Sequence, residues 1–198
     1  MDEGYIKFNC HWTPSNDISL QMVAELNLWR NRMYEKGLIG EYPDGIGFGN
    51  ISQRWKGNTF LISGTATGAF TTLTESHYSL VTQYDLGTNS VTCEGGAKAS
   101  SESLTHAAIY ECSATTHAVI HVHQLDLWNK LIHQVPTSSA AVPYGTPEMA
   151  HEIKRLFAET SLPTEKIMVM GGHQEGIISF GKDLAEAGNI LLDKLNLL

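Results

Sequence analysis

The sequence has no apolar run that approaches the roughly 20 residues needed to cross a membrane. It also lacks a signal-peptide pattern, because its first residues, Met1-Asp2-Glu3, are acidic. We therefore expect a cytoplasmic protein that has no membrane partner. Repeats, low-complexity segments and linkers are absent as well, so the 198 residues are expected to form a single globular domain, residues 1–198.

Cysteines and basic residues are both scarce. The three cysteines are odd in number and lack CxxC spacing, which predicts reduced thiols rather than a disulfide framework. Thirteen Lys and Arg stand against 21 Asp and Glu, giving a net charge of -8. This balance argues against a nucleic-acid partner, which requires a basic face. It leaves room for a small anion held by backbone N–H groups and hydroxyls.

A histidine pair closes the apolar stretch 116–123, whose sequence is THAVIHVH. The stretch predicts a buried strand, because residues 118–122 are apolar apart from His121 and contain no Gly or Pro. Alternation places His121 and His123 on one face, roughly 7 Å apart at Cα, so both imidazoles can reach one ion. Two ordinary core or surface histidines are the alternative, and the spacing favours a metal site that still needs further ligands.

Two segments are rich in small residues. In 45–52 three glycines fall within five residues, which allows close approach of a ligand or simply a tight turn. A strand expected at 59–62 then leads into 63–68, whose hydroxyl and glycine content suits a phosphate-binding loop or an ordinary connection. Without a βαβ context, the glycines are no dinucleotide fingerprint.

The remaining pattern alternates strands and helices, which predicts a layered α/β domain. The sheet should be partly antiparallel, because 167–180 reads as a hairpin. Residues 1–16 are expected to be irregular, with helices and strands following. Helices are expected from Asp17 or Ser19 to about 36 and at 99–110, 126–133, 148–159 and 183–195, and strands at 78–85 and from 88 to about 91.

Five motifs, taken in order, resemble the class II aldolase/adducin family, which includes L-fuculose-phosphate aldolase and L-ribulose-phosphate 4-epimerase. The resemblance covers roughly residues 20–195. Its motifs are Gly49-Asn50-Ile51-Ser52, the 63–68 loop with Leu73-Thr74-Glu75-Ser76-His77, Ser100-Ser101-Glu102 with His106 and Tyr110, His121-Val122-His123, and Pro143-Tyr144-Gly145-Thr146 with the later His173.

The resemblance implies a three-layer α/β/α fold with a central, mainly antiparallel sheet, assembled as a homotetramer with sites between subunits. It implies a zinc-dependent lyase that cleaves a ketose phosphate through a metal-stabilised enediolate. Another divalent metal in place of zinc, an epimerase or dehydratase acting on a similar sugar phosphate, and a non-catalytic adducin-like interaction domain are the alternatives.

The resemblance also assigns roles to residues. His121, His123 and a third histidine correspond to metal ligands, and Glu102 to the catalytic acid/base. On the helix pattern alone, Glu102 would instead be a first-turn charge that pairs with His106. The positions that correspond to phosphate contacts are Asn50, Thr65, Thr67, Gly68, Ser100 and Ser101.

The chain departs from the family pattern at two places. Where the family has His-His-Gly, this chain reads Gly172-His173-Gln174-Glu175-Gly176. His173 fits the third ligand after a two-residue shift and completes a set of three imidazoles, with Glu175 as the ungapped alternative. The C-terminal extension that carries a catalytic tyrosine in the fuculose-phosphate enzyme has no counterpart, so the pattern does not select aldol cleavage among the enzyme reactions.

Overall fold

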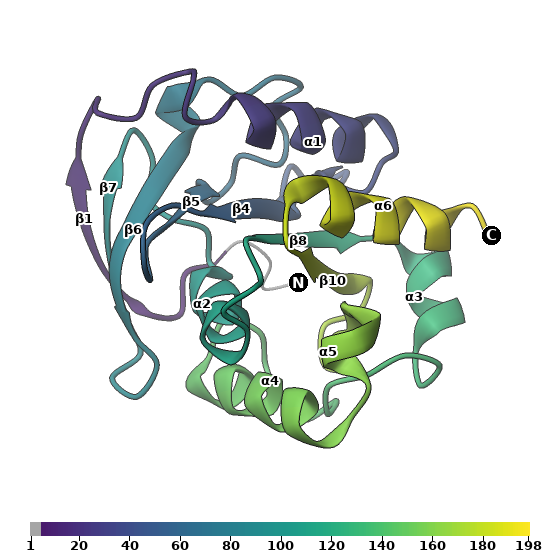
Figure 1. The fold of residues 1–198 in the computed structure, drawn as a ribbon. Coiled ribbons are helices and arrows are strands. Elements are labelled where there is room, and N and C mark those ends of the chain that lie inside the picture. The colour runs from purple at the N-terminus through teal and green to yellow at the C-terminus, as the bar shows by residue number, and fades with distance from the viewer. Residues whose placement is uncertain (1–4) are drawn as a thin grey trace.

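The computed structural model describes residues 5–198, which form an eight-stranded sheet between layers of helices (Figure 1). All neighbouring strands are antiparallel except the edge pair β1–β7. The three-layer fold with a mainly antiparallel sheet is therefore confirmed. In spatial order the strands are β1 (Asn9–Pro14), β7 (Ser90–Gly95), β6 (Tyr78–Asp85), β5 (Phe60–Ser63), β4 (Asn50–Arg54), β8 (Ala118–His123), β10 (Gly176–Gly181) and β9 (Ile167–Val169).

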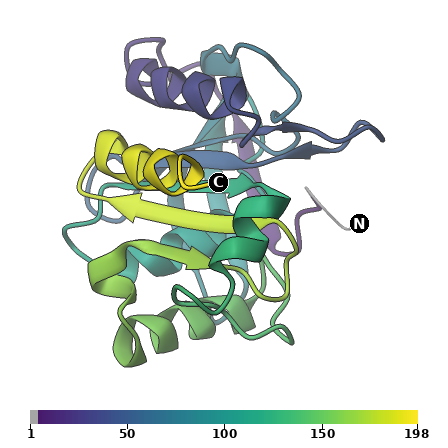
Figure 2. The same cartoon turned by 90° about the vertical axis from the view of Figure 1, so that its right-hand side faces the viewer.

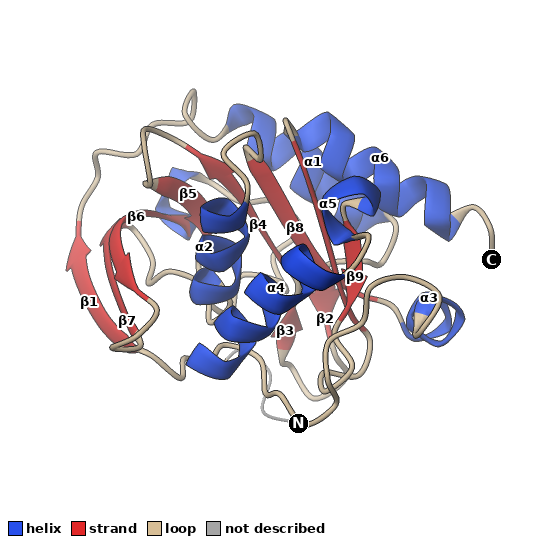
Figure 3. Cartoon of the chain, turned by 60° about the horizontal axis from the view of Figure 1, so that its bottom comes forward, coloured by secondary structure: helices blue, strands red, loops and turns tan. Residues whose placement is uncertain are grey.

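Helices cover both faces of this sheet. Helices α1 (Ala24–Glu35) and α6 (Leu184–Leu195) lie on one face, and α2 (Ser103–Cys112) and α4 (Pro147–Glu159) lie on the other (Figures 1 and 3). The shorter helices α3 (Leu125–Leu131) and α5 (Leu162–Glu165) follow β8 and α4, and a 3-10 turn occupies Glu75–His77. In the part of the chain that the structure describes, no helix is long and apolar enough to span a membrane.

Strand β8 shows how the sequence divides between two cores. Val119 packs in the cluster that contains α2 and α4, whereas Ala118, Ile120 and Val122 pack in the cluster that contains α1 and α6. All six residues of β8 are buried, because helices cover both of its faces. Burying each large aliphatic side chain contributes about 1.5–3 kcal/mol. The alternation predicted for 116–123 is thus confirmed.

Three boundaries differ from the sequence prediction. Residues 9–14, expected to be irregular, form the edge strand β1, whose register Asn9↔Ser90 is set by the distant strand β7. Helix α1 begins at Ala24 rather than Asp17 or Ser19, because Ile18 reaches the core from an irregular segment and Val23 from the turn at 20–23. Helix α2 begins at Ser103, which leaves Glu102 just before its first turn.

A small hairpin precedes β4 and was not predicted. Strands β2 (Gly40–Glu41) and β3 (Gly47–Phe48) pair with each other and extend beside the main sheet (Figure 2). Gly49, with φ 77°, turns the chain from β3 into β4. A Cβ there would lie 2.7 Å from Ile39 and 3.1 Å from the carbonyl of His121, so the turn requires glycine.

Candidate active site

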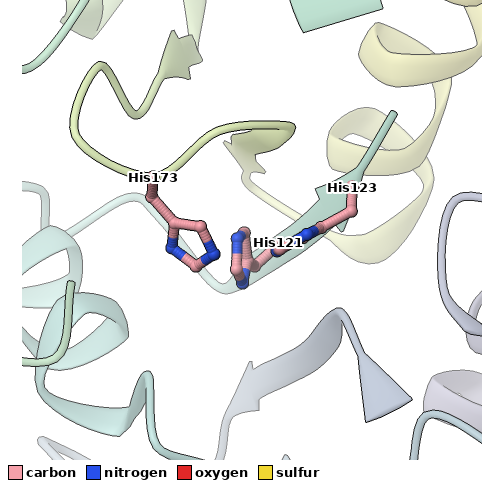
Figure 4. A group of neighbouring side chains, drawn as sticks. All are labelled: His121, His123 and His173. Atoms are coloured by element: carbon pink, nitrogen blue, oxygen red, sulfur yellow. The ribbon is translucent and has the colours of Figure 1, made fainter. Parts of the chain in front are cut away.

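Three imidazoles converge at one end of the central strands. His121 and His123 come from β8, and His173 comes from the turn between β9 and β10 (Figure 4). Each offers a ligand nitrogen, and these atoms lie within 4.8 Å of one another. All three side chains are buried. In the β10–β8 register Gly176 lies opposite His123. The turn just before Gly176, which carries His173, therefore lies beside His121 and His123.

The surroundings of His121 suit a metal ligand. Its Nδ1 lies 3.2 Å from the Asn50 amide nitrogen Nδ2, while Asn50 Oδ1 is buried with no hydrogen-bond partner within residues 5–198. Exchanging the two amide atoms would let Oδ1 accept the Nδ1 proton of His121. Its Nε2 is buried and has no hydrogen-bond partner among the described residues. Burial, followed by the neighbouring His123 and His173, holds the pKa of His121 well below its usual range. A neutral imidazole with an unused buried nitrogen is the form that binds a metal.

A tyrosine and a carboxylate orient His123. The Tyr42 hydroxyl donates to Glu175 Oε2 at 2.7 Å and lies 2.7 Å from His123 Nδ1. Because its single proton is donated to Glu175, the tyrosine oxygen accepts the Nδ1 proton of His123, which leaves Nε2 for a metal. Glu175 adopts φ 73° and faces Tyr42, so the three-imidazole cluster contains His173 and not Glu175.

Glu102 is fully buried beside the cluster. Its Oε1 lies 3.8 Å from His173 Nδ1. The prediction that Glu102 lies in the first turn is wrong, because Glu102 is the N-cap residue of α2 and its side chain makes no capping hydrogen bond. The proposed pairing with His106 is wrong as well, since the Nδ1 of His106 lies 2.7 Å from Ser52 Oγ. The carboxylate therefore sits at the histidines.

A small hollow adjoins the histidine cluster. It is lined by every residue that the sequence suggested for phosphate, namely Asn50, Thr65, Thr67, Gly68, Ser100 and Ser101, together with Gly47, Gly49, Gly64 and Ala66. Asn50 lines the hollow and also contacts His121, so the two sites are contiguous. The residues predicted to bind a metal and those predicted to bind a phosphate thus lie next to each other.

The loop 65–69 presents unused donors to this hollow. Thr65 N–H bonds the carbonyl of Lys98, but the N–H groups of 66–69 donate no hydrogen bond within residues 5–198. Ala66 has φ 58°, a left-handed conformation that turns successive N–H groups into a concave anion-binding arrangement. A Cβ at Gly47 would lie 3.1 Å from Gly68 N and 3.3 Å from Ala69 N, so this glycine leaves room in front of both donors.

Several residues of the site carry no local sequence signal. Tyr42 lies in the unpredicted hairpin, and Lys7 comes from the N-terminal segment. The Lys7 ammonium sits 3.7 Å above the Tyr144 ring, which packs 4.5 Å from the His173 ring. Phe48 stacks on His123 at 5.5 Å. Tyr144 belongs to a family motif and Phe48 to the glycine-rich segment 45–52, whereas Tyr42 and Lys7 are placed by contacts between distant segments.

Comparisons with known proteins show the family and the fold. Residues 31–192 match the class II aldolase and adducin N-terminal domain family. An L-fuculose-1-phosphate aldolase from Thermus thermophilus superposes with a TM-score of 0.62 at 20% identity over 86% of this chain and 87% of that one.

Two further solved structures share the fold. A sugar-phosphate aldolase from Thermotoga maritima gives a TM-score of 0.60 at 19% identity over 89% of this chain and 96% of that one. YgbL from Klebsiella pneumoniae, described as a candidate aldolase/epimerase/decarboxylase, gives 0.65 at 18% identity over 91% and 89%. No curated protein matches. Because the family match spans most of the chain, the protein belongs to the class II aldolase and adducin N-terminal domain family.

Proposed function

We propose that this protein is a zinc-dependent sugar-phosphate aldolase, a carbon–carbon lyase that cleaves a ketose phosphate. The observation that carries the proposal is the contact between Asn50 and His121, which joins a three-imidazole cluster to a hollow of unused N–H donors. A substrate with a phosphate at one end and a carbonyl near the other would occupy both at once. The names of two solved structures with this fold, both aldolases of sugar phosphates, support the same substrate class.

His121, His123 and His173 would hold the metal, since three neutral imidazoles form an ordinary zinc set that leaves a position open. Zinc or another divalent ion would supply Lewis-acid stabilisation of the negative charge on an enediolate. The chain's own groups would do the rest. The N–H groups of 66–69 and the hydroxyls of Ser100 and Ser101 would bind the phosphate and fix the orientation of the substrate.

Glu102 would carry the proton. It is the carboxylate beside the histidines, 3.8 Å from His173, and its burial removes competing water. In aldol cleavage it would take the hydroxyl proton as the carbon–carbon bond breaks, and then return a proton to the enediolate carbon. Buried Tyr144, packed on His173, would shield this exchange from solvent.

Epimerisation or dehydration of a similar phosphate would use the same groups, and the YgbL likeness is the observation that keeps this second candidate. An adducin-like interaction domain without chemistry fits less well. Burying a carboxylate beside three imidazoles costs free energy, and a scaffold gains nothing from that cost. A homotetramer with sites at subunit interfaces stays a prediction of the family resemblance, and a cytoplasmic location stays a prediction from the N-terminal sequence.

The first prediction concerns metal content. Purified protein incubated with zinc should hold one ion per chain by mass spectrometry, and His121→Ala should hold almost none. His117→Ala is the matched control, because His117 precedes the same strand but is exposed and lies outside the cluster. Wild-type protein that binds no zinc after this incubation would contradict the proposal. With zinc bound, a screen of pentulose and hexulose phosphates for aldehyde release would then separate cleavage from epimerisation.

A further inference from the structure

Arg30 of helix α1 lies behind the loop that lines the hollow. Its side chain is 1% exposed, and its guanidinium donates to the carbonyls of Thr67, Gly68 and Thr71 at 3.2, 2.8 and 3.1 Å. No carboxylate of residues 5–198 pairs with it. A buried charge is thus satisfied by the carbonyl dipoles of a single loop.

These hydrogen bonds fix which way the loop's donors face. In a trans peptide the C=O and the following N–H point in opposite directions, and no described peptide bond is cis. The carbonyls of Thr67 and Gly68 turn toward Arg30, so the N–H groups of Gly68 and Ala69 turn away from it. On that side lies the space left by Gly47, which lines the hollow.

The positive charge of the Arg30 guanidinium therefore lies directly behind the backbone of the loop that lines the hollow. The chain as a whole is acidic, with a net charge of -8, so an anion needs local attraction. Arg30 is buried, and water and salt therefore screen its field weakly. A guanidinium suits the position better than an ammonium, because its rigid fork of five donors serves three carbonyls at once.

We propose that Arg30 is the positioning residue of the anion loop: it turns the N–H groups of Gly68 and Ala69 into the hollow and supplies the charge that attracts a phosphate there. The proposal rests on the phosphate site of the proposed function. Arg30 lies outside the matched family region, residues 31–192, and outside the sequence motifs. Arg30 touches no substrate and acts through the backbone of the loop.

Arg54 provides a matched control. Its guanidinium also donates to backbone carbonyls, those of Thr116, Tyr110, Gly57 and Ser113. It stands at the opposite end of β4 from Asn50, about 13 Å along the strand. Loss of either arginine should destabilise the fold, but only loss of Arg30 should change the hollow.

The test measures binding of inorganic phosphate by calorimetry to the zinc-loaded full chain, at a temperature where circular dichroism shows each variant folded. Arg30→Met should raise the phosphate Kd about tenfold, whereas Arg54→Met should leave it within about twofold. At saturating phosphate, hydrogen exchange of the amides 66–69 should be faster in Arg30→Met than in wild type, and unchanged in Arg54→Met. If Arg30→Met does not fold, Arg30→Lys, which keeps the charge but not the fork, should show about a threefold loss and faster exchange.

The phosphate affinities and exchange rates of these variants distinguish three outcomes. A folded Arg30 variant with wild-type phosphate affinity and unchanged amide exchange overturns the proposal. An equal loss of affinity in Arg54→Met also overturns it, because the effect would then come from general destabilisation. Wild-type protein that binds zinc but no phosphate removes the anion site of the proposed function itself, and with it this role of Arg30.

Discussion

At the scale of single residues, Glu102 occupies a costly position. Removing an ionised carboxylate from water costs several kcal/mol even after relaxation, and Glu102 is fully buried. A charge at the helix start would return only about 0.3–1 kcal/mol, and the side chain of Glu102, the N-cap residue of α2, makes no capping hydrogen bond. Positions that cost more stability than they return are expected where the charge is used for chemistry.

Glu102→Gln should therefore separate activity from stability. The amide keeps the shape of the side chain but cannot titrate, so turnover on an active sugar phosphate should fall by about 10²–10⁴. The melting temperature should change far less than turnover, because the amide keeps the shape of the side chain and a hydrogen-bond acceptor. Both are measured on one zinc-loaded sample, with Glu111→Gln as control, an exposed carboxylate at the end of the same helix.

Near-wild-type turnover in Glu102→Gln, with zinc still bound, would remove Glu102 from the mechanism. The proton carrier would then be sought at Glu175, which reaches His123 through Tyr42, or on a neighbouring subunit. A loss of turnover in Glu111→Gln of the same size would instead point to a general effect of altered charge on α2.

At the scale of elements, one departure from the family pattern, the altered turn at 172–176, meets the unpredicted β2–β3 hairpin. The altered turn that carries His173 and Glu175 is joined to the β2–β3 hairpin by the bond from Tyr42 to Glu175, across 133 residues of sequence. The sequence could predict β8 and its histidine face, because alternation and apolar content are local signals. It could not predict Tyr42, because two-residue strands have no period and the tyrosine's partners are distant.

Tyr42→Phe should weaken zinc binding. The change removes one oxygen, so His123 loses the acceptor at 2.7 Å that holds its ring and its tautomer. Loss of such a supporting bond costs roughly 10–100-fold in metal affinity. Competition with a chromogenic chelator measures the zinc Kd, and Tyr84→Phe, on distant strand β6, is the control. Equal zinc affinity in Tyr42→Phe and wild type would show that the hairpin does not orient His123.

At the scale of the whole molecule, the layered arrangement of helices and strands was predicted from the sequence, but the edge strand of the sheet was not. Periodic segments such as 148–159 and 183–195 became α4 and α6 almost unchanged. Strand β1 was missed because it is an edge strand, held by pairing to β7 and only half-covered through Cys10 and Trp12. Residues 9–14 form a strand because β7 pairs with them, and their own sequence has no pattern that predicts this pairing.

The fold also buries neutral histidines in its interior, which ties stability to pH. His106 lies in the core under β4, and burial lowers its pKa to about 3 from 6.5. Below pH 6.5 His106 binds a proton in the unfolded chain but not in the folded chain, so the free energy of unfolding decreases as the pH falls. One such group contributes up to about 1.4 kcal/mol per pH unit, until the pH reaches the folded pKa.

Metal-free protein should therefore lose melting temperature steadily from pH 6.5 toward pH 4, and His106→Asn should make the decline shallower. Asparagine keeps a polar partner for Ser52, which now lies 2.7 Å from His106 Nδ1, and it does not titrate. The decline should persist in part, because burial also depresses the pKa of His121. His151→Asn, an exposed position on α4, should follow wild type at every pH. Parallel curves for His106→Asn and wild type would mean that His106 is not a source of the acid sensitivity, and the buried imidazoles of the candidate metal centre would then account for it.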